Sequence, residues 1–212
     1  MKSQISIVSS MGGTGSTSFI HWFSRRISVN CYLNSEGLPK RGPGANPKGL
    51  KHRLDPPRQN DPHLPNVNAI KNAVFITDTP YNIIPSLFRR KIAAGHAKAI
   101  SGHRPEHENN LESFLSHGID SFCFTEQFEN WTSHENQRGY KRLIVRFPHL
   151  WNYLDQIFDF LEISRLEVEK FPPKKERNSS FDGLPEEDKE RFKAIYSSLD
   201  EKINNTPNLI II

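Results

Sequence analysis

Glycine and hydroxyl residues gather directly after the first apolar run of the chain. Residues 5–8 read Ile-Ser-Ile-Val, and residues 9–18 continue Ser-Ser-Met-Gly-Gly-Thr-Gly-Ser-Thr-Ser. Glycines can adopt positive φ, which lets successive N–H groups face one anion, and a helix N-terminus adds about half a positive charge. The pattern therefore indicates binding of a phosphate or sulfate group. The candidate binding residues are Gly12, Gly13, Thr14, Gly15, Ser16, Thr17 and Ser18.

This loop departs from the pattern G-x-x-x-x-G-K-[ST] of ATPases and kinases. Ser10 stands where the first glycine is required, and Ser16 stands where the lysine is required. A Gly/Ser/Thr-rich stretch between a strand and a helix can also be a simple tight connection. Here an amphipathic helical pattern follows at once, formed by Phe19, Ile20, Trp22, Phe23 and Ile27. A strand, a loop and such a helix in this order favour the anion site.

Strands and helices are expected to alternate along the rest of the chain. Apolar runs predict strands over residues 73–77, 142–147 and 209–212. Apolar residues at helical spacing predict helices over 110–133, 150–161 and 192–203. A further helix is expected to start near Ile84, because proline is tolerated in a first turn and Pro85 would then lie there. Residues 94–109 are interpreted as a polar loop, whose histidines lack the neighbouring cysteines or helical pattern of a metal site.

This alternation predicts an α/β, three-layer, P-loop-like fold, in which helices flank a mostly parallel central sheet. We expect residues 1–212 to form a single domain, since 212 residues can bury one sizeable core. Ligands bind such sheets at the carboxyl ends of the strands. The glycine loop, the turn at Asp78 and the turn after Arg146 are therefore expected to share one edge.

Composition indicates a soluble protein that is 35% hydrophobic and 25% charged. No apolar run approaches the roughly 20 residues of a membrane span, so the expected location is the cytoplasm. Cys31 and Cys123 lack metal-ligand spacing and are interpreted as packing residues. The net charge of +4 comes from dispersed basic residues, which favours a polyanionic small ligand over nucleic acid. Trp22, Trp131 and Trp151 are interpreted as core or interface aromatics.

Residues 35–66 form a long stretch rich in proline, glycine, lysine and arginine. Irregular segments of this length inside a compact domain are commonly functional covers or disordered, and we expect a lid or substrate loop here. Its basic stretch, residues 48–53, could contact an anionic ligand, although a solvated run of charge is the commoner explanation.

The order of these pieces resembles that of the PAPS-dependent sulfotransferase family, whose members transfer a sulfuryl group from 3′-phosphoadenosine-5′-phosphosulfate. Residues 13–17 match the family's loop of basic-Ser-Gly-Ser/Thr-Thr form. Residues 78–80 match its Arg-x-Pro turn, and Ser86 matches the serine of the helix that follows. Residues 145–150 and 160–162 echo a late Val-Arg-Tyr-Glu-Asp-Leu segment and a helix ending in Phe-Leu-Gly.

The resemblance implies transfer of a sulfuryl group from PAPS to a hydroxyl or amine of a small-molecule or glycan acceptor, with no metal. The N–H groups of residues 13–17 would hold the 5′-phosphosulfate in an in-line displacement. Further cofactor contacts are expected from Ser86, Arg89, Lys175 and Arg177. His52, in the expected lid, is the candidate catalytic base, with His63 as its rival; an exposed loop histidine without a role is the alternative for either.

Two positions depart from the family pattern. Gly13 stands where the family carries a lysine or arginine, and Asp78 stands where an arginine holds the 3′-phosphate. Two further functions therefore stay open. One is a P-loop nucleotide kinase or NTPase, in which Asp78 would hold magnesium. The other is a degenerate relative that binds a nucleotide or a partner without catalysis. The sequence does not indicate an oligomeric state.

Overall fold

The computed structural model describes residues 4–30, 50–58, 69–102, 110–135, 138–176 and 181–212. A four-stranded sheet lies at its centre, with the strand order β1-β2-β3-β4. Its strands are β1 (Gln4–Ser10), β2 (Ala69–Thr77), β3 (Lys141–Arg146) and β4 (Leu209–Ile211). Strands β1, β2 and β3 pair in parallel, and β4 pairs antiparallel with β3. The predicted α/β class and mostly parallel sheet are confirmed.

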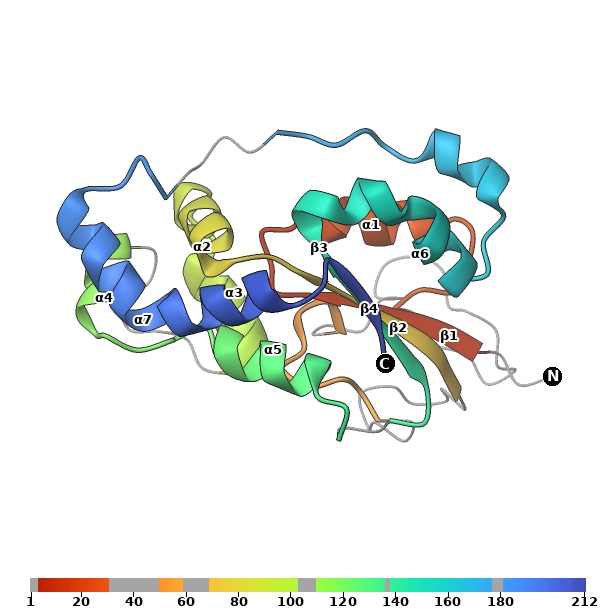
Figure 1. Ribbon diagram of the computed structural model, residues 1–212, viewed down its shortest axis with the longest axis horizontal. Helices are drawn as coiled ribbons and strands as arrows, with labels where there is room; N and C mark the ends of the chain where they lie inside the picture. Colours follow the sequence, from red (N-terminus) through yellow and green to blue (C-terminus); the bar gives the residue numbers. More distant parts are fainter. Residues whose placement is uncertain (1–3, 31–49, 59–68, 103–109, 136–137, 177–180) are drawn as a thin grey trace.

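Helices cover both faces of this sheet (Figure 1). One face packs against α1 (Ser16–Phe23) and α6 (Leu154–Phe160). The other packs against α2 (Pro80–Arg89), α3 (Ala93–Ser101), α5 (Phe124–Thr132) and α7 (Glu186–Asn205). The remaining elements are α4 (Leu111–Ser116) and the 3₁₀ helices η1 (Leu50–His52), η2 (Phe147–Tyr153) and η3 (Arg165–Lys170). None of the described helices is long and apolar enough to cross a membrane.

Side chains that point alternately to the two faces of the sheet divide the core into two clusters. Along β2, Ala73 and Phe75 face the larger cluster, whereas Val74 and Ile76 face the cluster beneath α1 and α6. Successive side chains of a strand point to opposite faces, so an unbroken apolar run is what a sheet covered on both sides requires. The predicted strands at 73–77, 142–147 and 209–212 correspond to β2, β3 and β4.

Two expectations about the middle of the chain are wrong. Helix α2 begins at Pro80 rather than near Ile84, because Pro80 itself takes the first-turn position and Pro85 lies inside the helix. Pro85 lacks the N–H that would bond one turn back, and burial of its neighbours Ile83 and Ile84 offsets that loss. Residues 94–101, part of the stretch 94–109 that the sequence predicts as a polar loop, lie in α3. This helix buries Ala93, Ala94, Ala97 and Ile100, and small residues give only a weak apolar pattern.

The other predicted helices are present with different limits. The region 110–133 holds α4 and α5, separated by a short turn, and 192–203 lies inside α7. The region 150–161 opens as the 3₁₀ helix η2 before it continues as α6. Of the expected lid, only residues 50–58 are described, and they pack onto β1, with Leu50 in the core. The rest of the lid lies outside the described residues.

Candidate anion-binding site

The loop between β1 and α1 has the backbone conformation that its glycines predict. Gly12, Gly13 and Gly15 adopt φ of 96°, 59° and 66°, values that other residues rarely adopt. The loop starts beside β2, where the Met11 N–H donates to the Ile76 carbonyl. It ends at Gly15, the residue that caps α1. The loop therefore lies at the carboxyl edge of the parallel strands, directly before a helix N-terminus.

The hydrogen-bond donors of this loop are largely unused. Within the described part of the chain, no acceptor is found for the amide N–H groups of residues 13–17. The Thr14 side chain is 1% exposed, and its hydroxyl has no partner. The Ser16 hydroxyl accepts a hydrogen bond of 2.9 Å from Ser10. Unpaired N–H groups at the start of a helix are the donors that an oxyanion requires.

A lysine from another segment of the chain reaches this loop. Lys51, in η1, donates from Nζ to the hydroxyl of Thr17 in the first turn of α1. Burial lowers the pKa of Lys51, and the positive charge of Arg90 lowers it further. The loop itself has no lysine at position 13 or 16. The ammonium of Lys51 instead lies at the end of the loop, on Thr17. The basic stretch at 48–53 was the sequence signal for this cation, although it did not single out Lys51.

His52 lies behind the loop and not on an exposed lid. It is 9% exposed, and its Nδ1 lies 3.0 Å from the Ser10 carbonyl oxygen and 3.3 Å from the Ser10 hydroxyl. Burial is the largest cause that lowers the pKa of His52 to about 4, so the imidazole is neutral at pH 7. The alternative of a solvent-exposed histidine at this position is wrong. His63 lies outside the described residues.

His96, a half-buried residue of α3, packs against His52. Its ring centroid lies 4.0 Å from that of His52, and burial, followed by the nearby charge of His52, lowers the pKa of His96 to about 2. Its Nε2 is buried and has no hydrogen-bond partner among the residues that the structure describes. The same atom lies against Gly12, where an added Cβ would meet it at 1.8 Å. Sequence reasoning missed this residue because α3 was assigned to a loop.

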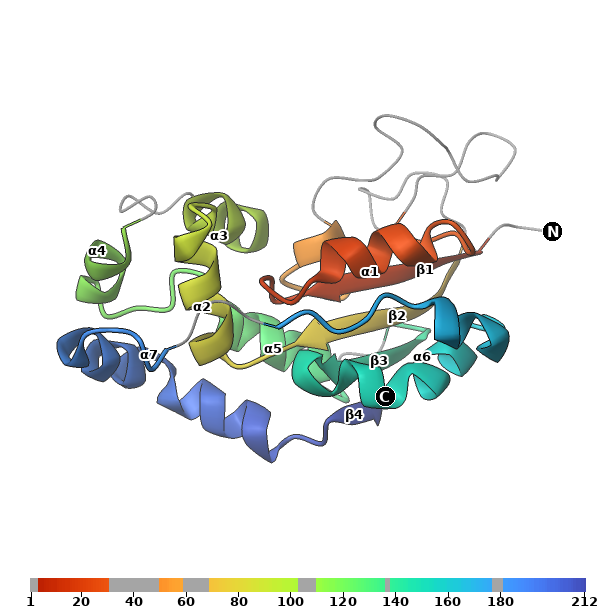
Figure 2. The ribbon, with the colours of Figure 1, turned by 90° about the horizontal axis from the view of Figure 1, so that it is seen from above.

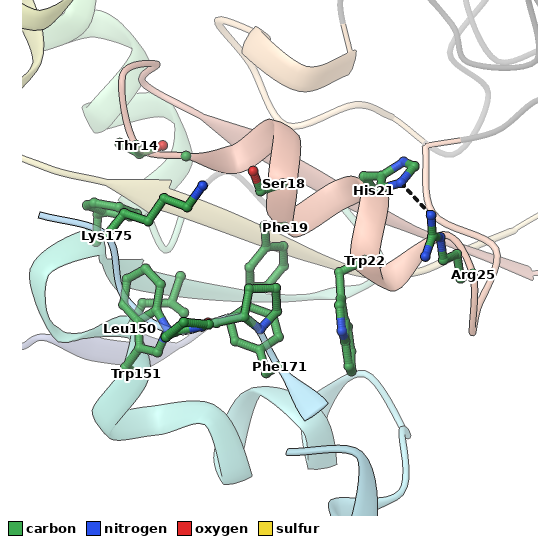
Figure 3. Close-up of a pocket in the computed structure, with 14 residues that line it drawn as sticks. Thr14, Ser18, Phe19, His21, Trp22, Arg25, Leu150, Trp151, Phe171 and Lys175 are labelled. Atoms are coloured by element: carbon green, nitrogen blue, oxygen red, sulfur yellow. Dashed lines mark hydrogen bonds between the residues drawn. The ribbon is translucent and has the colours of Figure 1, made fainter. Parts of the chain in front are cut away.

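A pocket of about 400 Å³ opens beside the loop, on the face of the sheet that carries α1 (Figure 3). Thr14, Gly15 and Ser18 line the end nearest the loop, and His21 and Arg25 line the far end. Five aromatic side chains also line it, those of Phe19, Trp22, Phe147, Trp151 and Phe171. A pocket of this size and composition suits a planar small-molecule group.

Lys175 reaches this pocket from the segment that follows η3. In Figure 2 this segment runs back between α1 and α6. Two indole N–H groups hold its start, since Trp22 donates to the Lys170 carbonyl at 3.1 Å and Trp151 donates to the Pro172 carbonyl at 2.9 Å. The Lys175 ammonium has no partner among the described residues, and in Figure 3 it points toward Ser18. Trp22 and Trp151 thus support the pocket, whereas Trp131 is a core residue as interpreted.

Ser86 and Arg89 do not line this pocket. Ser86 is buried within α2, and Arg89 is exposed; the next residue, Arg90, is the one whose charge acts on Lys51. Arg177 lies outside the described residues. The buried Asp78 carboxylate accepts from the Thr79 N–H at 2.8 Å and from Asn82 Nδ2 at 2.9 Å, at the start of α2.

Searches against protein-family models and against curated proteins found no match to this chain. The loop, the lysines that reach it and the pocket are therefore the features that indicate a function.

Proposed function

We propose that the chain is a sulfotransferase with a P-loop-like fold, which binds PAPS at residues 12–18 and transfers its sulfuryl group to an acceptor hydroxyl or amine. The observation that carries the proposal is the row of unpaired N–H groups at residues 13–17 beside an aromatic pocket. The proposed acceptor is a small molecule or glycan, and the proposed location is the cytoplasm.

The loop and the aromatic pocket match the phosphosulfate and the adenine of PAPS, respectively. The phosphosulfate would take the N–H groups of the loop, since anions are stabilised at a helix N-terminus. The adenine would enter the pocket between rings such as Phe19 and Trp151, and stacking of a base on an aromatic side chain contributes about 1–3 kcal/mol. Lys175, which has no described partner, would then pair with a phosphate at the mouth of the pocket.

The proposed reaction is an in-line displacement at sulfur. A bond forms between the acceptor oxygen or nitrogen and sulfur, while the bond from sulfur to the phosphate oxygen breaks and its electron pair stays on the phosphate. The proton of the acceptor hydroxyl or amine passes to solvent water. The N–H groups of residues 13–17 would stabilise that developing charge. His52 contacts Ser10 behind the loop, so we assign it the positioning of Ser10 rather than removal of the acceptor proton.

One observation favours this function over a magnesium-dependent kinase or NTPase. In those proteins a P-loop hydroxyl and a carboxylate after a strand hold the metal. Here the Thr17 hydroxyl, at the matching loop position, accepts from the Lys51 ammonium. The Asp78 carboxylate accepts from the Thr79 and Asn82 nitrogens at the start of α2.

Thermal unfolding with adenosine 3′,5′-bisphosphate, with ATP and magnesium, or with buffer alone tests the proposal. A ligand that binds only the folded state raises the unfolding temperature, and we expect the bisphosphate to raise it most. Release of the bisphosphate from PAPS in the presence of acceptor hydroxyls and amines then measures turnover. Stabilisation without turnover would indicate the non-catalytic relative, and no stabilisation at millimolar bisphosphate would rule out this cofactor.

A further inference from the structure

The segment that carries Lys51 is fixed to the sheet and to α5 by its backbone. The Ser9 hydroxyl donates to the Lys51 carbonyl at 3.2 Å and accepts from the Arg53 N–H at 3.2 Å. On the other side, the Arg53 carbonyl accepts from Gln127 Nε2 at 2.8 Å and from Trp131 Nε1 at 3.0 Å. The Cα of Lys51 is therefore held in place by β1 and α5, and its side chain reaches Thr17 from a rigid base.

No carboxylate among the described residues compensates the charge of the Lys51 ammonium. Lys51 forms no ion pair with any described carboxylate. The charge that acts on it is the like charge of Arg90, and its pKa is lowered, first by burial. The pKa values of the nearby His52 and His96 are also lowered, so neither histidine adds charge at pH 7. The Lys51 ammonium thus lies at Thr17, next to the unpaired N–H groups of the loop, where an anion would compensate its charge.

We propose that Lys51 is the residue that contacts the transferred group, in place of the cation that the glycine loop lacks. The anion would take the hydrogen bond that Lys51 now donates to Thr17. During transfer, the ammonium would stabilise the negative charge that builds on the leaving phosphate oxygen as the sulfur–oxygen bond breaks. The identity of this group rests on the proposed function, whereas the contact between Lys51 and an anion can be tested without it.

The variants are Lys51→Met, which removes the charge, and Lys51→Arg, which keeps it. The matched control is Lys174→Met, because Lys174 is an exposed lysine whose ammonium donates to the Pro148 carbonyl. Inorganic sulfate is the first probe, with sodium chloride at equal ionic strength as reference. We expect Lys51→Met to weaken the apparent sulfate affinity about tenfold, the equivalent of one hydrogen bond to a charged group. Lys51→Arg should restore much of it, and Lys174→Met should change it little.

A stability readout distinguishes loss of an anion contact from general damage. Without sulfate, Lys51→Met should unfold at the same temperature as the parent protein or at a higher one, because a desolvated charge beside Arg90 has been removed. With sulfate, the parent protein should gain more than the variant. A variant that is destabilised without sulfate and gains as much from it as the parent protein would overturn the proposal.

Turnover of PAPS is the second probe. We expect Lys51→Met to lower kcat by about 10²–10³, as removal of one charge-stabilising donor does, and to weaken binding of adenosine 3′,5′-bisphosphate far less. If the parent protein binds the bisphosphate and transfers sulfuryl groups while Lys51→Met does so equally well, the inference is wrong and the proposed function stands. If sulfate binding depends on Lys51 but the bisphosphate does not bind, the function is wrong and Lys51 is still the anion contact.

Discussion

His96 fills the space where Gly12 has no side chain. A Cβ on Gly12 would lie 1.8 Å from His96 Nε2, so the glycine loop and α3 are in direct contact. On the same side, His52 holds Ser10 through its carbonyl and hydroxyl. The loop is thus supported from behind by two uncharged imidazoles, which leaves its unpaired N–H groups as the part available to a ligand.

Gly12→Ala should therefore disturb the loop. The added methyl group meets the His96 ring, and φ of 96° is unfavourable for alanine. We expect a loss of about 1–3 kcal/mol in the free energy of unfolding, measured by urea denaturation. Gly95→Ala is the matched control, because Gly95 lies in α3 with nothing within 4 Å of its added Cβ. That change should stabilise the protein by about 0.5–1 kcal/mol; equal effects of the two changes would contradict the close contact.

The buried histidines predict a loss of stability in mild acid. The folded-state pKa values of His52 and His96 are about 4 and about 2, below the value of about 6.5 in an unfolded chain. As the pH falls below about 6.5, the unfolded chain takes up these protons and the folded protein does not. Each histidine should then lower the free energy of unfolding by about 1.4 kcal/mol per pH unit, until its folded pKa is reached.

Urea denaturation at about pH 7 and about pH 5 measures this dependence. Carboxylates also titrate in acid, so the comparison needs the double variant His52→Asn, His96→Asn. Its free energy of unfolding should fall less steeply between the two pH values than that of the parent protein. Parallel slopes would mean that the imidazoles are protonated in the folded state.

Lys175 should contribute to binding of the bisphosphate without affecting the fold. Its ammonium has no partner among the described residues, so Lys175→Met should leave the unfolding temperature of the free protein unchanged. We expect the dissociation constant of adenosine 3′,5′-bisphosphate to rise about tenfold or more, measured by calorimetry. Lys174→Met serves again as control, and an unchanged dissociation constant in Lys175→Met would place the phosphate elsewhere.

Tryptophan fluorescence should report the filling of the pocket. Trp22 and Trp151 line it, whereas Trp131 is buried against Phe75 in the core. A base that stacks near Trp151 should change the emission of the protein, and Trp151→Phe should remove much of that change while an aromatic wall is kept. The same variant loses the hydrogen bond to the Pro172 carbonyl, so the affinity should fall moderately. A ligand-induced change that is intact in Trp151→Phe would place the base outside this pocket.

The sequence was sufficient for the parts of the fold that depend on local pattern. Unbroken apolar runs identified β2 and β3, and glycine chemistry identified the loop, because both signals lie within a few neighbouring residues. Helix α3 was not predicted, since the buried Ala93, Ala94 and Ala97 do not form a strong apolar stripe. Pro85 made the predicted start of α2 too late, because the sequence does not distinguish a proline inside a buried helix from a proline in its first turn.

Local sequence pattern predicts only part of the candidate site. It predicts residues 13–17 and Lys175 as contacts of an anion. In the structure, residues 13–17 belong to the glycine loop and Lys175 lines the mouth of the pocket. The approach of Lys51 to Thr17 joins residues far apart in the sequence and depends on how the segment 50–58 packs on β1 and α5. Such a contact has no local pattern. For the same reason the pairing of His52 with His96 was not foreseen.

When the positive charge comes from outside the glycine loop, the conformation of the loop and the position of the charge can change independently. A lysine built into the loop ties charge and backbone shape to the same few positions, so neither can change alone. In this chain the two are separated: the glycines set the conformation, and Lys51 arrives on a segment anchored by Ser9 and Gln127. A sequence pattern that requires a basic residue within the glycine loop would therefore not detect a protein whose lysine comes from another segment of the chain.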